Sequence, residues 1–174
     1  PISRGEFERM LAATASVVGQ QHAASWRFLL RGLWRSGLRL GESLQLYWDR
    51  PDKFHVVDLD GKFPLFRIPG ELDKGSKSHS FPMAPDCAEF LRKVPVARRK
   101  GRVFRPRTVS GPVHNVASAS AVISAIGQAA GVVVSAKPRC NRRTGQVEQK
   151  RKFSSAHDLR RTFAFRWSPR VSLP

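Results

Sequence analysis

Apolar side chains recur every three or four positions along the first 36 residues, and this spacing predicts two amphipathic helices. The first runs from about Arg4 to Val18, because Ser3 and Glu6 form a capping box ahead of the apolar stripe. The second runs from about Gln21 to Ser36 and stops before Gly37, a residue typical of helix C-termini. Its broad apolar face makes it the expected centre of the core, with Trp26, Leu29, Leu30, Leu33 and Trp34.

Beyond residue 53 the pattern changes to short β-rich runs separated by turn residues, which is typical of strands. Three strands are predicted to form a small antiparallel sheet: Phe54–Val57, Phe63–Ile68 and Ser80–Met83. Asp60 and Gly61 make the first turn. The second turn contains a glycine and places Lys74 on a hairpin that can reach a ligand.

Helical spacing returns in the second half of the chain. A short helix is predicted from Pro85 to about Val94, and a longer one begins after Asn115 and ends at Gly131. The last helix starts at Ser155, with Asp158 placed to complete its cap. We expect three side chains to anchor this helix in a core, namely Leu159, Phe163 and Trp167.

Net charge changes the picture from an ordinary globular domain to a polyanion-binding one. The chain has 31 Lys and Arg against 13 Asp and Glu, a formal charge of +18. Such an excess favours nucleic acid as the partner, with an anionic membrane surface second. Two stretches, 92–107 and 137–152, hold about half of the basic residues. Proline and glycine interrupt the first stretch, so we expect a solvated loop there.

Several classes of protein are disfavoured by composition. The only cysteines are Cys87 and Cys140, so no disulfide framework is expected and a reducing interior fits best. Neither has a metal-ligand spacing, and we predict no structural metal. Residues 113–136 lack charged side chains, yet their serines and small residues favour a helix inside a soluble core over a membrane span. No signal peptide is visible.

Three separate stretches carry similar chemistry: Arg39 with Glu42, Lys74, and His157 with Arg160. Arginine forks bind phosphate oxygens bidentately and stabilise a pentacoordinate transition state without a metal. Lysine and histidine can move protons. The absence of clustered carboxylates in the sequence argues against a two-metal nuclease or polymerase. For the last pair the simpler alternative is an exposed basic helix.

The motifs resemble those of the tyrosine recombinase (phage integrase) catalytic domain. The first arginine motif of that family is similar to Gly37-Leu38-Arg39-Leu40-Gly41-Glu42, and its lysine hairpin is similar to Lys74-Gly75-Ser76-Lys77. The most specific match is the H-x-x-R motif, His157-Asp158-Leu159-Arg160-Arg161-Thr162-Phe163. Order and approximate spacing agree, and the resemblance covers nearly the whole chain.

The resemblance implies a mainly α-helical domain with a small three-stranded antiparallel sheet, an α+β fold over residues 1–174. It implies that duplex DNA is cut and rejoined through a 3′-phosphotyrosyl intermediate, with neither metal nor cofactor. Arg39 and Arg160 would clamp the scissile phosphate, Lys74 would protonate the leaving 5′-oxygen, and His157 would assist the proton transfer of the nucleophile. Glu42 would brace the arginines, and Lys77 is an alternative to Lys74.

The resemblance also implies partners and a location. The complete protein would assemble as a tetramer on DNA, in the cytoplasm and associated with the nucleoid, and not with a membrane. Its origin would be a bacterium, a phage or a mobile element. Phosphate contacts are expected from basic residues of the two charged stretches and the last helix: Lys77, Arg98, Arg99, Lys100, Arg102, Arg139, Arg142, Arg143, Lys150, Arg151, Lys152 and Arg161.

The chain departs from the family at its end. Only 14 residues follow Arg160, and the family's later histidine or tryptophan and its nucleophilic tyrosine would lie beyond them. The one tyrosine, Tyr47, is expected to pack at the entrance of the sheet. We therefore expect a fragment, truncated at the C-terminus and without the N-terminal core-binding domain, that binds DNA but does not cleave it. The alternatives are an inactive accessory or regulatory DNA-binding protein, an RNA-binding protein and a type IB topoisomerase.

Overall fold

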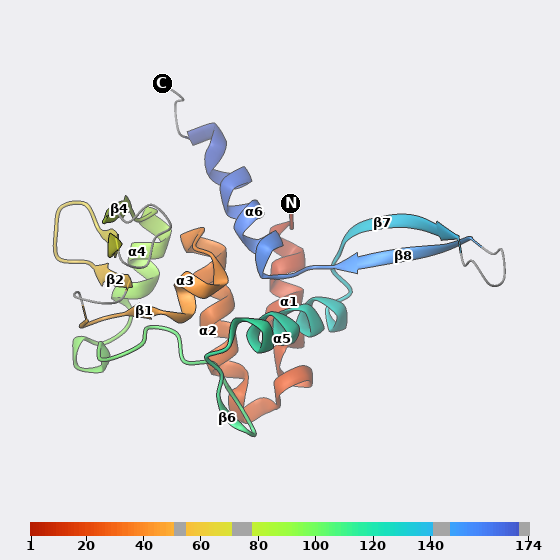
Figure 1. Cartoon of the computed structure of the whole chain (residues 1–174), viewed down its shortest axis with the longest axis horizontal. Helices are drawn as coiled ribbons and strands as arrows, with labels where there is room; N and C mark the ends of the chain where they lie inside the picture. Colours follow the sequence, from red (N-terminus) through yellow and green to blue (C-terminus); the bar gives the residue numbers. More distant parts are fainter. Residues whose placement is uncertain (51–54, 71–77, 141–146, 171–174) are drawn as a thin grey trace.

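The computed structural model of the chain describes residues 1–50, 55–70, 78–140 and 147–170 (Figure 1). It contains the helices predicted from the sequence and, in addition, a short helix over Leu40–Leu44 that was not predicted. The first begins and ends at the predicted residues, and the second begins one residue earlier than predicted. The α-helices are α1 (Arg4–Val18), α2 (Gln20–Ser36), α3 (Leu40–Leu44), α4 (Pro85–Arg92), α5 (Val116–Ala129) and α6 (Ala156–Trp167). Short 3₁₀ helices cover Val96–Arg98 and Ser168–Arg170.

Local caps explain these boundaries. The Ser3 hydroxyl accepts a hydrogen bond from the Glu6 N–H at 3.2 Å, and the Glu6 carboxylate accepts the Ser3 N–H at 2.8 Å. This is the predicted capping box of α1. Gly37 ends α2 in the left-handed conformation, at φ +65°, where the Phe163 ring occupies the space that a Cβ would need.

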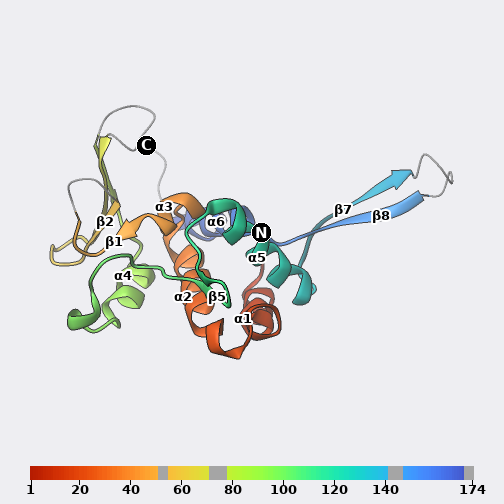
Figure 2. The same cartoon turned by 60° about the horizontal axis from the view of Figure 1, so that its bottom comes forward.

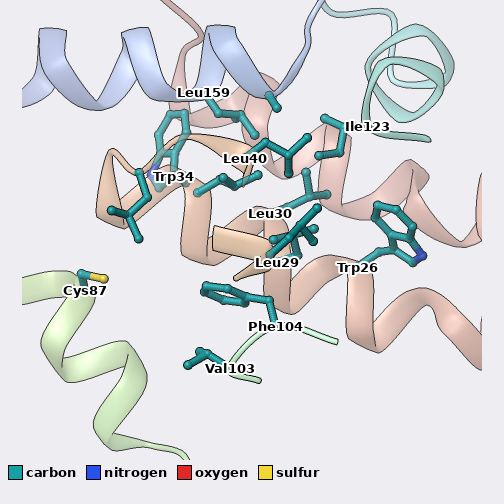
Figure 3. Packing of buried hydrophobic residues seen from close by; sticks show 14 of the residues in the cluster. Trp26, Leu29, Leu30, Trp34, Leu40, Cys87, Val103, Phe104, Ile123 and Leu159 are labelled. Atoms are coloured by element: carbon teal, nitrogen blue, oxygen red, sulfur yellow. The ribbon is translucent and has the colours of Figure 1, made fainter. Parts of the chain in front are cut away.

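Helix α2 lies at the centre of the core, as predicted (Figure 3). Trp26, Leu29 and Leu30 are fully buried. Phe104 reaches the same core from the basic stretch and packs so closely on Gly32 that a Cβ there would collide with its ring. The stretch 92–107 is therefore a largely irregular loop, as predicted, but it contributes to the core instead of being solvated throughout.

The predicted antiparallel sheet is present and has a short additional strand. Its order is β1-β2-β3-β4, where β2 pairs antiparallel with β3 and β3 with β4. The added strand β1 pairs parallel with β2 and follows α3 directly. The strands are β1 (Leu46–Tyr47), β2 (His55–Asp58), β3 (Leu65–Ile68) and β4 (His79–Pro82).

Two antiparallel ribbons complete the fold and are additions to the predicted elements. The small one pairs β5 (Arg107–Thr108) with β6 (Gly111–Pro112). The long one pairs β7 (Val133–Cys140) with β8 (Val147–Phe153) and extends away from the helices in both views (Figures 1 and 2). Most of the second basic stretch therefore lies on a β-ribbon. Among the described helices, none has the length and apolar character that a membrane span requires.

Candidate functional site

The first residues of three helices line one cavity of about 540 Å³. Leu40 and Gly41 open α3, Val116 opens α5, and Ala156 and His157 open α6. The N-terminal end of a helix carries partial positive charge and unpaired N–H groups, so the starts of α5 and α6 both favour an anion here. The remaining lining residues are Arg39, Glu42, Ser120 and Arg160.

Glu42 joins the two arginines that line the cavity. Its Oε1 accepts a hydrogen bond from Arg39 Nη1 at 2.7 Å, and its Oε2 lies 3.6 Å from Arg160 Nη1. The side chain of Glu42 is 17% exposed, against 71% for Arg39 and 36% for Arg160. A largely buried carboxylate thus holds two more exposed guanidinium groups side by side. A guanidinium has five N–H donors, so one ion pair leaves Arg160 with donors for another anion.

Short-range and tertiary contacts together fix the position of Glu42. Its Oε2 also accepts the backbone N–H of Arg39 at 2.6 Å, which caps the start of α3. Helix α3 has only five residues, too few to persist without tertiary support. His55 supplies part of that support from β2, because its Nδ1 lies 3.4 Å from the Glu42 carbonyl oxygen. The His55 ring is buried.

Helix α6 presents His157 and Arg160 from a rigid first turn. Asp158 Oδ2 accepts hydrogen bonds from the Ser155 N–H at 3.0 Å and from the Ser155 hydroxyl at 2.6 Å. Lys152 Nζ lies 3.3 Å from Asp158 Oδ1. Burial alone would raise the pKa of Asp158, but the hydrogen bond from the Ser155 hydroxyl and the charge of Lys152 outweigh it, so the pKa is lowered.

The body of α6 is tied to the core on another side. Leu159 is fully buried, and the hydroxyl of buried Thr162 accepts the backbone N–H of Ile2 at 2.8 Å. Phe163 and Trp167 are half-buried, with ring centres 6.1 Å apart. Anchoring by Leu159 is as predicted, and Thr162 is an anchor that the apolar pattern could not reveal.

The structure thus brings Arg39, Glu42, His157 and Arg160 together at one cavity. Lys74, the fourth predicted catalytic residue, lies outside the described residues. Three predicted phosphate contacts also lie outside them, namely Lys77, Arg142 and Arg143. For Arg139 the structure describes the backbone in β7 but not the side chain.

Besides Lys152, which pairs with Asp158, two predicted phosphate contacts make hydrogen bonds within the protein. Arg99 Nε donates to the Val94 carbonyl at 2.9 Å, and its Nη2 donates to the Arg92 carbonyl at 3.0 Å. Arg102 Nε donates to the Tyr47 hydroxyl at 3.0 Å. These arginines therefore stabilise the loop in which they lie. The predicted phosphate contacts whose side chains are exposed are Arg98, Lys100, Lys150, Arg151, Lys152 and Arg161.

Tyr47 has the packing role predicted for it. It is 8% exposed on β1, an edge strand of the four-stranded sheet, and its hydroxyl accepts the hydrogen bond from Arg102. Cys87 is also buried, and burial raises the pKa of its thiol to about 12. Neither side chain is therefore placed to act as a nucleophile at the cavity.

Comparison with known proteins identifies the fold. The sequence matches no protein-family model and no curated protein, whereas two solved structures match across its whole length. The chain resembles tyrosine recombinases and has the fold of their catalytic domain, mainly helical with small sheets.

One match is XerA recombinase, at 18% identity and a TM-score of 0.55 over 99% of this chain and 53% of that chain. The other is the Tn1549 transposon integrase in complex with transposon right end DNA, at 14% identity and a TM-score of 0.57 over 100% of this chain and 54% of that chain. The chain therefore spans about half the length of each protein that it matches.

Proposed function

We propose that the cavity between α3, α5 and α6 binds a phosphodiester of duplex DNA, and that this domain supplies the phosphate clamp of a tyrosine recombinase. One observation carries the proposal: Glu42 holds Arg39 and Arg160, which are far apart in the sequence, at a single cavity. Two guanidinium groups side by side repel each other unless an anion balances them. The N–H donors of the two groups match the oxygens of a phosphate, which would add negative charge between them.

The surroundings of the arginines favour the transition state of phosphoryl transfer. Attack on a phosphodiester adds negative charge to the non-bridging oxygens. The starts of α5 and α6 direct positive potential at the same cavity, and the arginines supply N–H donors to it. These groups are held by caps and packing before substrate arrives, so little reorganisation is needed. Such a site can stabilise the charge without a metal ion.

The proposed reaction forms a bond between a tyrosine oxygen and phosphorus and breaks the bond from phosphorus to the 5′-oxygen. His157, exposed at the start of α6, would accept the tyrosine proton directly or through water. Lys74 would give a proton to the leaving 5′-oxygen, the role that the resemblance implies. Reversal of the same steps rejoins the strands.

The nucleophile has to come from outside the 174 residues of the sequence. Tyr47 is the sole tyrosine, and it is buried with its hydroxyl hydrogen-bonded to Arg102. We assign residues 1–174 to one catalytic domain of a longer protein that supplies the tyrosine segment and a core-binding domain. The neighbour solved with transposon DNA supports duplex DNA as the substrate. Assembly as a tetramer on DNA and a cytoplasmic location belong to the same proposal.

Covalent adduct formation tests this function. The complete protein encoded by the reading frame is incubated with a nicked duplex whose sequence has been selected by binding, and the protein–DNA adduct is measured. Arg160→Ala is expected to abolish the adduct with little loss of DNA affinity. Arg161→Ala is the matched control, because Arg161 is the next residue of α6 and does not line the cavity. An equal loss in both variants would show that Arg160 is only a general contact.

A second candidate is an accessory protein that binds DNA and does no chemistry. The buried position of Tyr47 favours it, because the described residues then hold a phosphate clamp without an attacking group. The same experiment separates the two functions. Intact DNA binding by the complete protein without any adduct would establish the accessory function and exclude the recombinase.

A further inference from the structure

The β7–β8 ribbon leaves the protein body close to the cavity. At its base the Ser154 N–H donates to the Val132 carbonyl at 2.9 Å, and the Val132 N–H donates to the Gly127 carbonyl of α5 at 3.0 Å. Phe153, the last residue of β8, precedes His157 by only four residues. At about 3.3 Å per residue, the eight-residue strand β7 extends about 25 Å. Figures 1 and 2 show it extending away from the helices.

The pairing register places the described side chains of the ribbon on two faces. Directly opposite residues share a face, and successive residues alternate between faces. Lys137 is opposite Lys150 and Ser135 is opposite Lys152, and these four residues define what we call the lysine face; the register places the paired positions Arg139 and Glu148 on the same face. On the other face, which we call the arginine face, Ala136 is opposite Arg151 and Pro138 is opposite Gln149.

Two lysines lie directly opposite each other on the lysine face. Lys137 and Lys150 are exposed, and within the described residues no acidic side chain pairs with either. Like charges directly opposite each other destabilise a strand pair, and a two-stranded ribbon without a packed face has little stability to spare. Lys152 differs, because it pairs with Asp158. A polyanion along this face would remove the repulsion between Lys137 and Lys150.

We propose that the lysine face, through its outer residues Lys137 and Lys150, lies along the phosphate backbone of duplex DNA, beyond the phosphate held in the cavity, and that the arginine face points away from the DNA. That the ribbon lies beyond the cleaved phosphate rests on the proposed function. That the lysine face binds DNA does not depend on that function. A reach of about 25 Å corresponds to about seven base pairs of B-DNA at 3.4 Å per step. The ribbon would thus extend the contact to DNA that flanks the cleavage position.

Adjacent residues of β8 provide a matched pair of variants. Lys150→Gln and Arg151→Gln each remove one positive charge from an exposed side chain, on the lysine face and the arginine face respectively. The affinity of the 174-residue chain for a 30-base-pair duplex is measured by fluorescence anisotropy at several salt concentrations. Thermal unfolding followed by circular dichroism checks that both variants fold.

Lys150→Gln is expected to weaken binding about fivefold at 0.15 M salt and to reduce the slope of log K against log salt by about 0.9, the effect of one lost phosphate contact. Lys137→Gln should do the same, and Lys150→Arg should restore both values. Arg151→Gln should leave the slope unchanged. Equal losses at Lys150 and Arg151, or a loss at Arg151 alone, would overturn the inference.

The result is separable from the proposed function. If the lysine-face pattern appears but the complete protein forms no adduct, the recombinase function fails and the inference stands. If adducts form and Lys150→Gln binds like wild type, the function stands and the inference fails. If the chain does not bind duplex DNA at all, both fail.

Discussion

A single methyl group at Gly127 tests how firmly the base of the ribbon is packed on α5. Gly127 is a buried residue of that helix. A Cβ built there would collide with the carbonyl oxygen of Ser154 and lie 3.0 Å from its carbonyl carbon and 3.2 Å from its Cβ. Backbone atoms cannot rotate away as a side chain can, and the Ser154 N–H is fixed by its hydrogen bond to Val132. The two segments would have to separate.

Two opposing effects determine how much Gly127→Ala changes the free energy of unfolding. Alanine favours a helix over glycine by about 1 kcal/mol. Overpacking costs about 1–3 kcal/mol, and the upper part of that range applies because the obstacle is backbone. We expect a net loss of about 1–2 kcal/mol, which for a chain of this length lowers the Tm by about 2–8 °C. Ser155, the cap of α6, follows Ser154 directly, so His157 and Arg160 would shift as well.

The assay is thermal unfolding followed by circular dichroism, with Gly5→Ala as the control. Gly5 also lies in a helix, but nothing lies within 4 Å of a Cβ built on it. Gly5→Ala should therefore leave the Tm unchanged or raise it slightly, since only the helix propensity changes. A Tm for Gly127→Ala equal to or above that of wild type would refute the reasoning. It would show that the base of the ribbon can move away from α5 without loss of stability.

Two further predictions concern the carboxylates of the site. Asp158→Asn should lower the free energy of unfolding at pH 7. The folded pKa of Asp158 is depressed, so the carboxylate stabilises the folded protein fully above the unfolded pKa of about 3.9. The difference in unfolding free energy between wild type and variant should therefore shrink as the pH falls through the folded pKa. Urea unfolding at pH 7, 4 and 3 measures it, and a gap independent of pH would exclude the carboxylate charge as its cause. Glu42→Gln should lower the free energy of unfolding by at most about 1 kcal/mol, because the ion pairs it loses are partly exposed. It should nevertheless reduce adduct formation by the complete protein about tenfold or more, because the two arginines are no longer held in place. An unchanged adduct yield would contradict the role of Glu42.

The sequence predicts those parts of the fold that local chemistry determines. The Ser3–Glu6 box and Gly37 define helix ends through neighbouring atoms, so their positions could be read directly. The β7–β8 ribbon left no such signal. Hydrophobic periodicity reports which residues are buried, and most described side chains on both faces of the ribbon are exposed, so no apolar alternation marks its strands.

The same distinction applies to the site. Each half of the cavity has its own local motif, so Arg39, Glu42, His157 and Arg160 could be identified as candidates from the sequence. The bridge through Glu42 could not, because it joins α3 to α6 in space. Nor could the hydrogen bonds of Arg102 to Tyr47 and to the Leu44 carbonyl be foreseen within a stretch that is basic throughout. The net charge of a sequence indicates a polyanionic partner. It does not show which basic side chains are used inside the protein and which are left to bind that partner.

Lys152 shows how the ribbon and the cavity are connected. It belongs to the lysine face, yet its ammonium group pairs with Asp158, which caps the helix that presents His157 and Arg160. A phosphate drawn to Lys152 would compete with Asp158 for the same charge and loosen the cap. The first turn of α6 stays rigid only if Lys152 keeps its ion pair with Asp158 while the cavity holds a phosphate. The DNA therefore has to contact the outer lysines, Lys137 and Lys150.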